Sequence, residues 1–401
     1  MKDSLGLAID IGTTTVALYL IDMNTGAKIA TLSGMNAQSP YGADVTTRIE
    51  YCAHNGHEEL TNLIREQISL MIKRVCMQSD KNPEDIEYIS LAANTVMQHI
   101  IAGYSPVSMG TAPFTTFSLF GEELPAWEGL NVAENAKIYY TPSISAYVGG
   151  DITAGLLAAG FEDIHEPALF LDIGTNGEIV LKHNGTYYCC AAAAGPAFEG
   201  GGIEKGMIAE SGAINHVKRT YEPDVETYFT VIGGGMARGL CGSGLLDTLA
   251  VLLDLQVVDN SGRMHGGDKY WLTSGDENGV YITAGDIRKL QLAKAAIAAG
   301  IQVLLHYAGI SENDIKVFTL AGGFGNYMDL KGAERIGLYP KRMLGFAKAA
   351  GNTAGEGAVL ALKSEDARKQ LSKIKEQCEY VELSSMTFFN DRYVEQMAFE
   401  D

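Results

Sequence analysis

The sequence has few of the features that mark secreted, membrane-bound or nucleic-acid-binding proteins. It contains 30 Lys and Arg against 49 Asp and Glu, a net charge of −19, which leaves no basic stripe to neutralise the phosphates of nucleic acid or anionic lipids. No run of eighteen uncharged apolar residues occurs, and no signal-peptide apolar block follows the first residues. We therefore expect a cytoplasmic protein that binds neither nucleic acid nor a membrane.

Metal-ligand and hydrolase patterns are also missing. The six cysteines form no C-x-x-C pair, and the neighbours Cys189 and Cys190 would point to opposite faces of a strand, where they could not easily share a metal. The eight histidines show no metal spacing, and no G-x-S-x-G arrangement occurs. Buried thiols in a reducing compartment are one interpretation of the cysteines.

The composition itself is that of a folded globular protein. At 401 residues the chain exceeds the usual size of one hydrophobic core, so we expect two domains. Residues 151–159 and 350–362 carry small residues on adjacent turns, which is typical of closely packed helices. Periodicity predicts strands over 7–21, 28–35 and 86–92, and helices over 58–75, 245–253 and 285–307, with a further helix beginning at Ile203.

One motif is present in two copies, 162 positions apart. Each copy is an apolar strand, an Asp-Ile-Gly-Thr turn and a second strand, with Asp10 in the first copy and Asp172 in the second. We expect the glycines to let the backbone bend sharply and bring its N–H groups to an anion, with the hydroxyls adding donors. The predicted phosphate-binding residues are Gly12, Thr13, Thr14 and Thr15 (the first turn) and Gly174, Thr175, Asn176 and Gly177 (the second turn).

The aspartates of the motif are predicted to act beside the phosphates and not as phosphate ligands. Because like charges repel, Asp10 and Asp172 are expected to be partners of a hydrated Mg²⁺ that the phosphates also hold. Phosphoryl transfer needs mainly positioning and charge neutralisation, together with a group that orients the attacking water. Glu178 and Asp151 are both candidates for that group, and the sequence does not choose between them.

A third segment, residues 317–325, is an apolar strand running into a glycine turn. Without side chains at Gly322 and Gly323, its backbone could lie flat against an adenine or ribose face. In this order, the three segments resemble the ASKHA superfamily of ATPases, which includes acetate and sugar kinases, heat-shock chaperones and actin. The resemblance implies an α/β fold of two RNase-H-like lobes around an interlobe nucleotide cleft, with ATP and Mg²⁺ as cofactors.

The superfamily plan also implies a division of the chain. The first lobe would comprise residues 1–150 with 351–401, and the second lobe residues 151–350. A helix contacting ribose and adenine would follow the loop that contains Glu199, Gly200 and Gly201, although a solvated helix face is the competing interpretation for Glu199. The block at 241–244 is either a phosphate-facing helix N-terminus or a packing turn.

A narrower resemblance rests on several blocks: residues 41–45, 93–97, 143–151, 194–200 and 240–244, and the ending from 351–355 through 380–383. They are similar to the ATPase part of the reductive activators of corrinoid proteins, which include activating enzymes of O-demethylase systems. The resemblance implies that ATP hydrolysis drives reduction of a corrinoid protein from Co(II) to Co(I).

One departure from that family concerns the electron donor. Those activators usually carry an N-terminal iron–sulfur domain, and this sequence begins directly at the first phosphate strand, so it is a natural short form or a piece. Electrons are therefore expected from another domain or a separate iron–sulfur protein. A homodimer sharing a cluster between subunits is a further arrangement, and a small-molecule kinase and a non-catalytic nucleotide sensor are the alternative functions.

Overall fold

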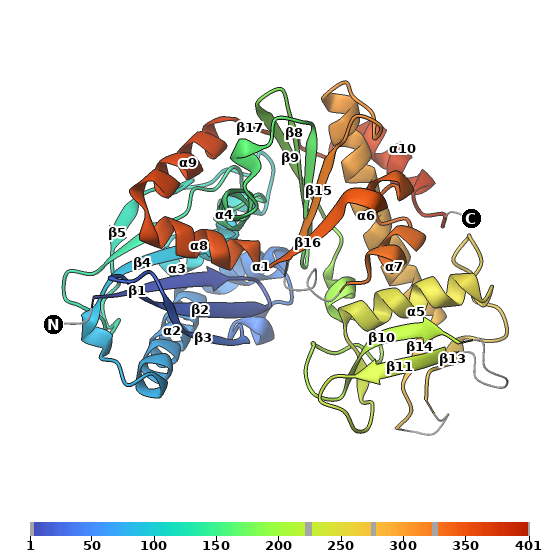
Figure 1. Ribbon diagram of the computed structural model, residues 1–401, viewed down its shortest axis with the longest axis horizontal. Helices are drawn as coiled ribbons and strands as arrows, with labels where there is room; N and C mark the ends of the chain where they lie inside the picture. The colour runs from blue at the N-terminus through green and yellow to red at the C-terminus, as the bar shows by residue number, and fades with distance from the viewer. Residues whose placement is uncertain (1–3, 221–226, 274–277, 323–327, 400–401) are drawn as a thin grey trace. The chain divides into compact units, whose positions relative to one another are not determined.

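The computed structural model describes residues 4–220, 227–273, 278–322 and 328–399, which fall into two compact units (Figure 1). Unit 1 comprises Met1–His165, Gly185–Tyr187 and Asn352–Tyr380, and unit 2 comprises Glu166–Asn184, Tyr188–Gly351 and Val381–Asp401. The lobe boundaries expected at 150/151 and 350/351 stay a prediction.

Unit 1 is built on a mixed sheet with strand order β3-β2-β1-β4-β6-β5. The strands are β1 (Leu5–Ile11), β2 (Thr15–Asp22), β3 (Lys28–Met35), β4 (Ile86–Ala93), β5 (Glu123–Pro125) and β6 (Lys137–Tyr140). Side chains alternate along β1, so Leu7, Ile9 and Ile11 enter one hydrophobic cluster while Ala8 enters another on the opposite face. Asp10 shares the face of Ala8, and this alternation decides which helices it meets.

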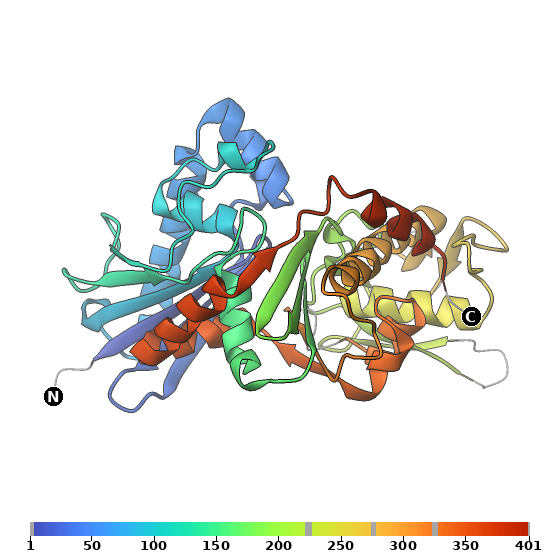
Figure 2. The ribbon, with the colours of Figure 1, turned by 90° about the horizontal axis from the view of Figure 1, so that it is seen from above.

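Helices cover both faces of this sheet (Figures 1 and 2). On the Leu7 face lie α1 (Val45–Asn55), α2 (Glu58–Gln78) and α3 (Thr95–Ala102). On the Ala8 face lie α4 (Gly150–Ala158) and α8 (Thr353–Lys363), and α9 (Glu365–Glu376) packs on α4 and α8. The short strand β17 (Cys378–Tyr380) also belongs to this unit.

The helices α4 and α8 approach one another unusually closely. A Cβ atom added to Gly357 would lie 2.0 Å from the carbonyl oxygen of Ala154, so only glycine fits at this crossing. Ala154 and Ala358 are fully buried in the same cluster as Ala8. The close packing predicted for the two small-residue segments is confirmed, and it brings the N-terminal ends of both helices to the sheet residue Asp10.

Unit 2 contains the second copy of the motif. Its main sheet has the order β16-β15-β7-β8-β9, with β7 parallel to β15 and antiparallel to β8. The strands are β7 (Ala168–Ile173), β8 (Gly177–His183), β9 (Thr186–Ala192), β15 (Val317–Ala321) and β16 (Ala347–Gly351). Smaller sheets hold β10 (Ala213–Arg219), β11 (Thr227–Val231) and β12 (Gly239–Leu240), and separately β13 (Lys269–Trp271) and β14 (Tyr281–Thr283).

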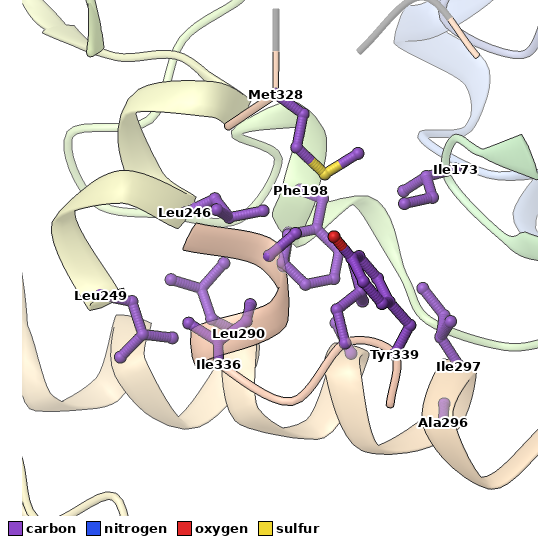
Figure 3. Packing of buried hydrophobic residues seen from close by; sticks show 14 of the residues in the cluster. Ile173, Phe198, Leu246, Leu249, Leu290, Ala296, Ile297, Met328, Ile336 and Tyr339 are labelled. Atoms are coloured by element: carbon purple, nitrogen blue, oxygen red, sulfur yellow. The ribbon is translucent and has the colours of Figure 1, made fainter. Parts of the chain in front are cut away.

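The core of unit 2 lies between its main sheet and its helices, which are α5 (Gly242–Asp254), α6 (Ala284–Tyr307), α7 (Leu330–Arg335) and α10 (Thr387–Glu395). Figure 3 shows Ile173, at the end of β7, and Phe198 reaching into one cluster with Leu290 and Tyr339. Helix α6 is long and apolar enough to cross a membrane, but 78% of its most apolar window is buried inside the unit. Its apolar character is therefore accounted for by the core.

Candidate functional site

The first turn is a tight connection whose backbone oxygens accept hydrogen bonds from other residues of unit 1. The N–H of Gly12 donates to the carbonyl of Thr15 (2.8 Å), which closes the β1–β2 hairpin. Asn36 binds two further carbonyls, because its side-chain amide donates to Gly12 O (2.9 Å) and its backbone N–H to Thr14 O (2.8 Å). The guanidinium of Arg48 donates to Thr13 O (2.5 Å). Three consecutive carbonyls are thereby fixed.

The orientation of the N–H groups follows from the carbonyls. In a trans peptide the C=O of one residue and the N–H of the next point in opposite directions. Since the carbonyls of Gly12 and Thr13 point to Asn36 and Arg48, the N–H groups of Thr13 and Thr14 point to the other side. The hydroxyl of Thr13 accepts from the amide of Asn94 (3.2 Å), the N-cap residue of α3. Side chains and backbone of unit 1 thus hold the carbonyls and one hydroxyl of the turn.

The glycines of the two turns differ in what surrounds them. Neither Gly12 nor Gly174 has a positive φ, so the sharp bend does not itself require glycine. A Cβ on Gly12 would lie 3.0 Å from Thr15 O, whereas the nearest atom to a Cβ on Gly174 would be 3.8 Å away. Packing within the turn therefore explains Gly12, whereas no contact among the described residues explains Gly174.

Asp10 lies where the N-terminal ends of two helices converge. Asn352, the N-cap residue of α8, donates from Nδ2 to Asp10 (2.8 Å) and to the hydroxyl of Tyr19 (3.2 Å). Asp151 stands in the first turn of α4 and interacts electrostatically with Asp10. Carboxylates are favourable at helix N-termini, where backbone N–H groups have no partner within the helix. Asp10, Asp151 and Asn352 therefore form one polar group inside unit 1.

The two carboxyl groups of this cluster hold protons unusually tightly. Desolvation raises the pKa of Asp10 to about 6, against a smaller lowering by the hydrogen bond from Asn352. Desolvation also raises the pKa of Asp151 to about 7, and the neighbouring charge of Asp10 adds to that rise. A pKa near neutrality suits a group that must accept a proton at physiological pH.

The second turn is shorter and is surrounded by carboxylates. It closes through the N–H of Gly174 and the carbonyl of Asn176 (3.0 Å). The hydroxyl of Thr175 donates to the Glu199 carboxylate (2.8 Å). Glu199 ends a 3₁₀ turn (Pro196–Glu199) that is anchored by the buried Phe198, while Ile173 anchors the strand before the turn in the same cluster (Figure 3). That shared anchorage explains why these segments meet.

Asp172 has two neighbours that the sequence singled out. Glu178 is its direct cross-strand partner in the β7–β8 hairpin, so both side chains lie on one face of the sheet. Gly322 follows β15 beside Asp172; its φ is +98°, and a Cβ there would lie 2.8 Å from Oδ1 of Asp172. The structure thus brings together the second turn, Glu178 and Gly322 in unit 2. Gly323 lies outside the described residues.

Other predicted residues have roles in packing. Gly177 contacts α6, since a Cβ on it would lie 2.6 Å from Ile297. A Cβ on Gly200 would lie 2.8 Å from Met207 O, and one on Gly201 2.6 Å from Pro196. The helix expected from Ile203 is wrong, because residues 204–205 form a turn and Gly206 forms an isolated β-bridge with Leu240. These glycines let the loop fold on itself, and their contacts with a nucleotide stay a prediction.

The block at 241–244 opens helix α5, as expected, and supports the packing interpretation. A Cβ on Gly244 would lie 2.1 Å from Ile214 O, so β10 and α5 touch at that glycine. Cys241 donates from Sγ to the same carbonyl (3.4 Å). Cys189 and Cys190 are fully buried, and burial raises the pKa of the Cys190 thiol. All three cysteines are therefore accounted for as small buried side chains.

The donor set fits a hydrated Mg²⁺ better than a fully protein-bound metal. Within the described ranges no group of three or more His, Cys, Asp or Glu side chains is placed to hold a metal ion. Mg²⁺ keeps several waters and commonly binds through one or two carboxylates together with substrate phosphates. Burial raises the pKa values of Asp10 and Asp151 because it disfavours their charged forms. A nearby cation would stabilise these charged carboxylates.

Sequence reasoning missed the residues that support the first turn: Asn36, Arg48, Asn94 and Asn352. Asn94 and Asn352 each lie in a block used for the family resemblance, and Arg48 follows another block by three residues. Those blocks were the available signal for these residues in the sequence. Their contacts with the first turn, however, depend on the fold.

Comparison with family models covers nearly the whole chain. Residues 166–401 match the model described as the C-terminal domain of RACo, the ASKHA domain, and residues 5–164 match the RACo middle region. The chain belongs to the RACo family. The predicted α/β ASKHA fold and the resemblance to reductive activators are thereby confirmed.

Individual relatives agree with the RACo assignment. The chain is 33% identical, over its full length, to 71% of the corrinoid activation enzyme RamQ of Eubacterium limosum. It is 25% identical, over 98% of its length, to 77% of the [Co(II) methylated amine-specific corrinoid protein] reductase of Methanosarcina barkeri. A solved reductive activator for corrinoid, iron-sulfur protein matches with a TM-score of 0.91 and 36% identity, covering 99% of this chain and 66% of the solved one. These relatives are longer than this chain.

Proposed function

We propose that this RACo-family chain binds and hydrolyses ATP to drive the reductive activation of a corrinoid protein from Co(II) to Co(I). Electrons are supplied by another domain or protein. The observation that carries the proposal is the Asp10–Asp151–Asn352 group at the first turn, in a chain whose relatives are named as corrinoid activators. The two turns bind the phosphates, and Gly322 belongs to the adenosine segment.

Asp151 is the general base of the proposed reaction. Its carboxylate accepts a proton from a water molecule as the water oxygen forms a bond to the γ-phosphorus. The bond from that phosphorus to the β–γ bridging oxygen breaks, and ADP leaves with the electron pair. With a pKa near 7, Asp151 is substantially deprotonated at neutral pH, and it still holds the accepted proton well enough to favour its transfer.

Asp10 orients the reacting groups in this proposal. Asn352 holds its carboxylate at the end of β1 and so fixes its rotamer. Mg²⁺ carried with ATP, and held through water by Asp10 and Asp172, would draw negative charge from the phosphates. Glu178, the cross-strand partner of Asp172, is the other candidate base.

Coupling to a corrinoid protein gives hydrolysis a physical purpose. Reduction of Co(II) to Co(I) is uphill for ordinary donors, so an energy source is required. The nucleotide can change the partner only by as much as the partner's affinity differs between the ATP and ADP states. We therefore expect the affinity for the corrinoid protein to depend on which nucleotide is bound.

The test measures phosphate release and cobalt reduction together. We expect slow hydrolysis of Mg-ATP by the chain alone and faster hydrolysis when a Co(II) corrinoid protein is added. With a chemical low-potential donor present, Co(I) should form, by its absorption spectrum, only with ATP. Turnover that requires a small-molecule acceptor would indicate a kinase, and binding without turnover would indicate a sensor. Either result would contradict the proposal.

A further inference from the structure

Arg48 is a buried cation that the proposed mechanism does not use. The residue is 1% exposed, and its guanidinium lies directly behind the first turn. Besides Thr13 O, it donates from Nε to Gly42 O (3.1 Å) and from Nη1 to Gln38 Oε1 (3.0 Å) and to Met97 Sδ (3.2 Å). Every one of these acceptors is neutral.

In the part of the chain that the structure describes, no close anion neutralises the charge of Arg48. Among the described residues, none of its contacts is an ion pair with a carboxylate, and Asp44 acts on it only as a more distant charge. Burial lowers the pKa of Arg48 to about 10, which leaves the side chain charged at neutral pH. A buried charge without an opposite partner is unfavourable, and an anion brought nearby relieves that cost.

The sequence around Arg48 is arranged to place it there. Asp44 caps α1, with Thr47 completing a capping box, so Arg48 falls on the first turn of the helix. A Cβ on Gly42 would lie 2.9 Å from Cγ of Arg48, so glycine leaves room for its stem. Met97 comes from the block at 93–97, which also supplies Asn94 to Thr13. Two blocks without a catalytic role thus converge on one guanidinium.

We propose that Arg48 is a positioning residue for the nucleotide phosphates, supplying the positive charge behind the first turn and fixing the Thr13 carbonyl. The inference rests on the proposed ATP binding. Its action passes through the peptide between Thr13 and Thr14: a charged donor on the carbonyl polarises that peptide and strengthens the N–H on its other side. An acidic chain of net charge −19 thereby obtains a local cation without a lysine at the turn.

The experiment separates charge from structure with Arg48→Gln and Arg48→Lys. Affinities for Mg-ATP and for adenosine are measured by calorimetry. We expect Arg48→Gln to weaken ATP binding by roughly 10- to 100-fold, about 1.4 to 2.8 kcal/mol, and to leave adenosine binding unchanged. Arg48→Lys keeps the charge and should retain ATP affinity within about threefold, although it loses the planar fork.

Arg65→Gln is the matched control. Arg65 is a half-buried arginine of unit 1. Like Arg48, it donates to a backbone carbonyl, that of Ile101 (2.9 Å), which lies at the C-terminal end of α3 and away from the turn. Its substitution should leave the ratio of ATP to adenosine affinity unchanged. Thermal unfolding without nucleotide is recorded for every variant, because a merely structural role would lower stability and weaken both ligands equally.

The outcomes distinguish this inference from the proposed function. Wild-type ATP affinity in Arg48→Gln would overturn the role of Arg48, as would equal losses for ATP and adenosine in both Arg48 variants. If the wild-type chain binds no ATP, the proposed function fails. Thermal stabilisation of the protein by inorganic pyrophosphate then decides whether Arg48 supports an anion site at the first turn. Stabilisation that Arg48→Gln abolishes would support an anion site backed by Arg48, and no stabilisation of the wild type would overturn it.

Discussion

The two copies of the Asp-Ile-Gly-Thr motif differ in their electrostatic surroundings. Behind the first turn lies a buried cation, Arg48, whereas the second turn is hydrogen-bonded to a carboxylate, Glu199. The residue paired with Asp10 across its hairpin is Ala17, while the residue paired with Asp172 is the acidic Glu178. Nearly the same local sequence therefore forms two different sites.

This difference suggests a division of labour between the turns. A turn whose carbonyls are held by protein donors, one of them a buried cation, suits the negative phosphates. A turn with three carboxylates nearby suits the cation that accompanies ATP, because carboxylates repel phosphate but attract Mg²⁺. We therefore expect the first turn to contribute mainly to phosphate affinity and the second mainly to dependence on Mg²⁺.

The largest expected effect tests which turn supplies the general base. Asp151→Asn should lower turnover by about 100- to 10,000-fold with ATP affinity retained, because the amide cannot accept the proton. Glu178→Gln is the counterpart at the second turn and should lower turnover far less. Phosphate release at saturating ATP checks both, and the reverse order of effects would move the base to Glu178.

The pH profile sharpens the same assignment. A base works only when deprotonated, so with the pKa of Asp151 near 7 the wild-type rate should rise from pH 5.5 to 8 and level off above. Bound Mg²⁺ would move the midpoint lower by favouring the carboxylate. The residual rate of Asp151→Asn should lack this rise, and a wild-type rate that is flat with pH would contradict the role.

The next largest loss of turnover is expected from substitution of the two motif aspartates. Asp10→Ala and Asp172→Ala should each reduce turnover about 10- to 100-fold, the usual range for loss of a residue that orients bound waters of a metal. The Mg²⁺ concentration for half-maximal rate should rise more for Asp172→Ala than for Asp10→Ala. The exposed Asp163→Ala is the control in unit 1. Equal Mg²⁺ dependence of the two variants would break the proposed division between the turns.

A smaller effect is expected from Glu199→Gln. Removing this carboxylate charge from beside the second turn should raise the affinity for metal-free ATP by about tenfold, as loss of roughly 1.4 kcal/mol of like-charge repulsion. The change has the opposite sign to that expected for Arg48→Gln. Titration with ATP in excess chelator measures it, and weaker metal-free binding would show that Glu199 supports the phosphates instead.

The smallest effect concerns the two glycines. Gly12→Ala should lower the free energy of unfolding by about 1 kcal/mol, because its Cβ would be 3.0 Å from Thr15 O. Gly174→Ala should change it by less than about 0.5 kcal/mol, since only ordinary contacts await its Cβ. Denaturant unfolding measures both. If Gly174→Ala nevertheless weakens ATP binding, the backbone of the second turn approaches the phosphate.

Much of the fold could be predicted because its signals are local. The apolar stripe of α2 and the long pattern of α6 are strong, and both helices form within a few residues of the predicted limits. Helix α1 was missed because its sequence, VTTRIEYCAHN, is mainly polar and begins with two β-branched threonines after the first valine. The helix expected at Ile203 was wrong because Gly206 packs directly on Gly200 O.

The sequence by itself determined the two motif copies, their strands and the family, because those depend on residues within a few positions of one another. Only the tertiary structure decided what surrounds each copy: Asn352 reaches Asp10 across 342 positions, and Arg48 reaches Thr13 across 35. Hydrogen bonding and desolvation act over a few ångströms in space whatever the separation along the chain. For that reason two copies of one Asp-Ile-Gly-Thr motif could acquire surroundings of different charge.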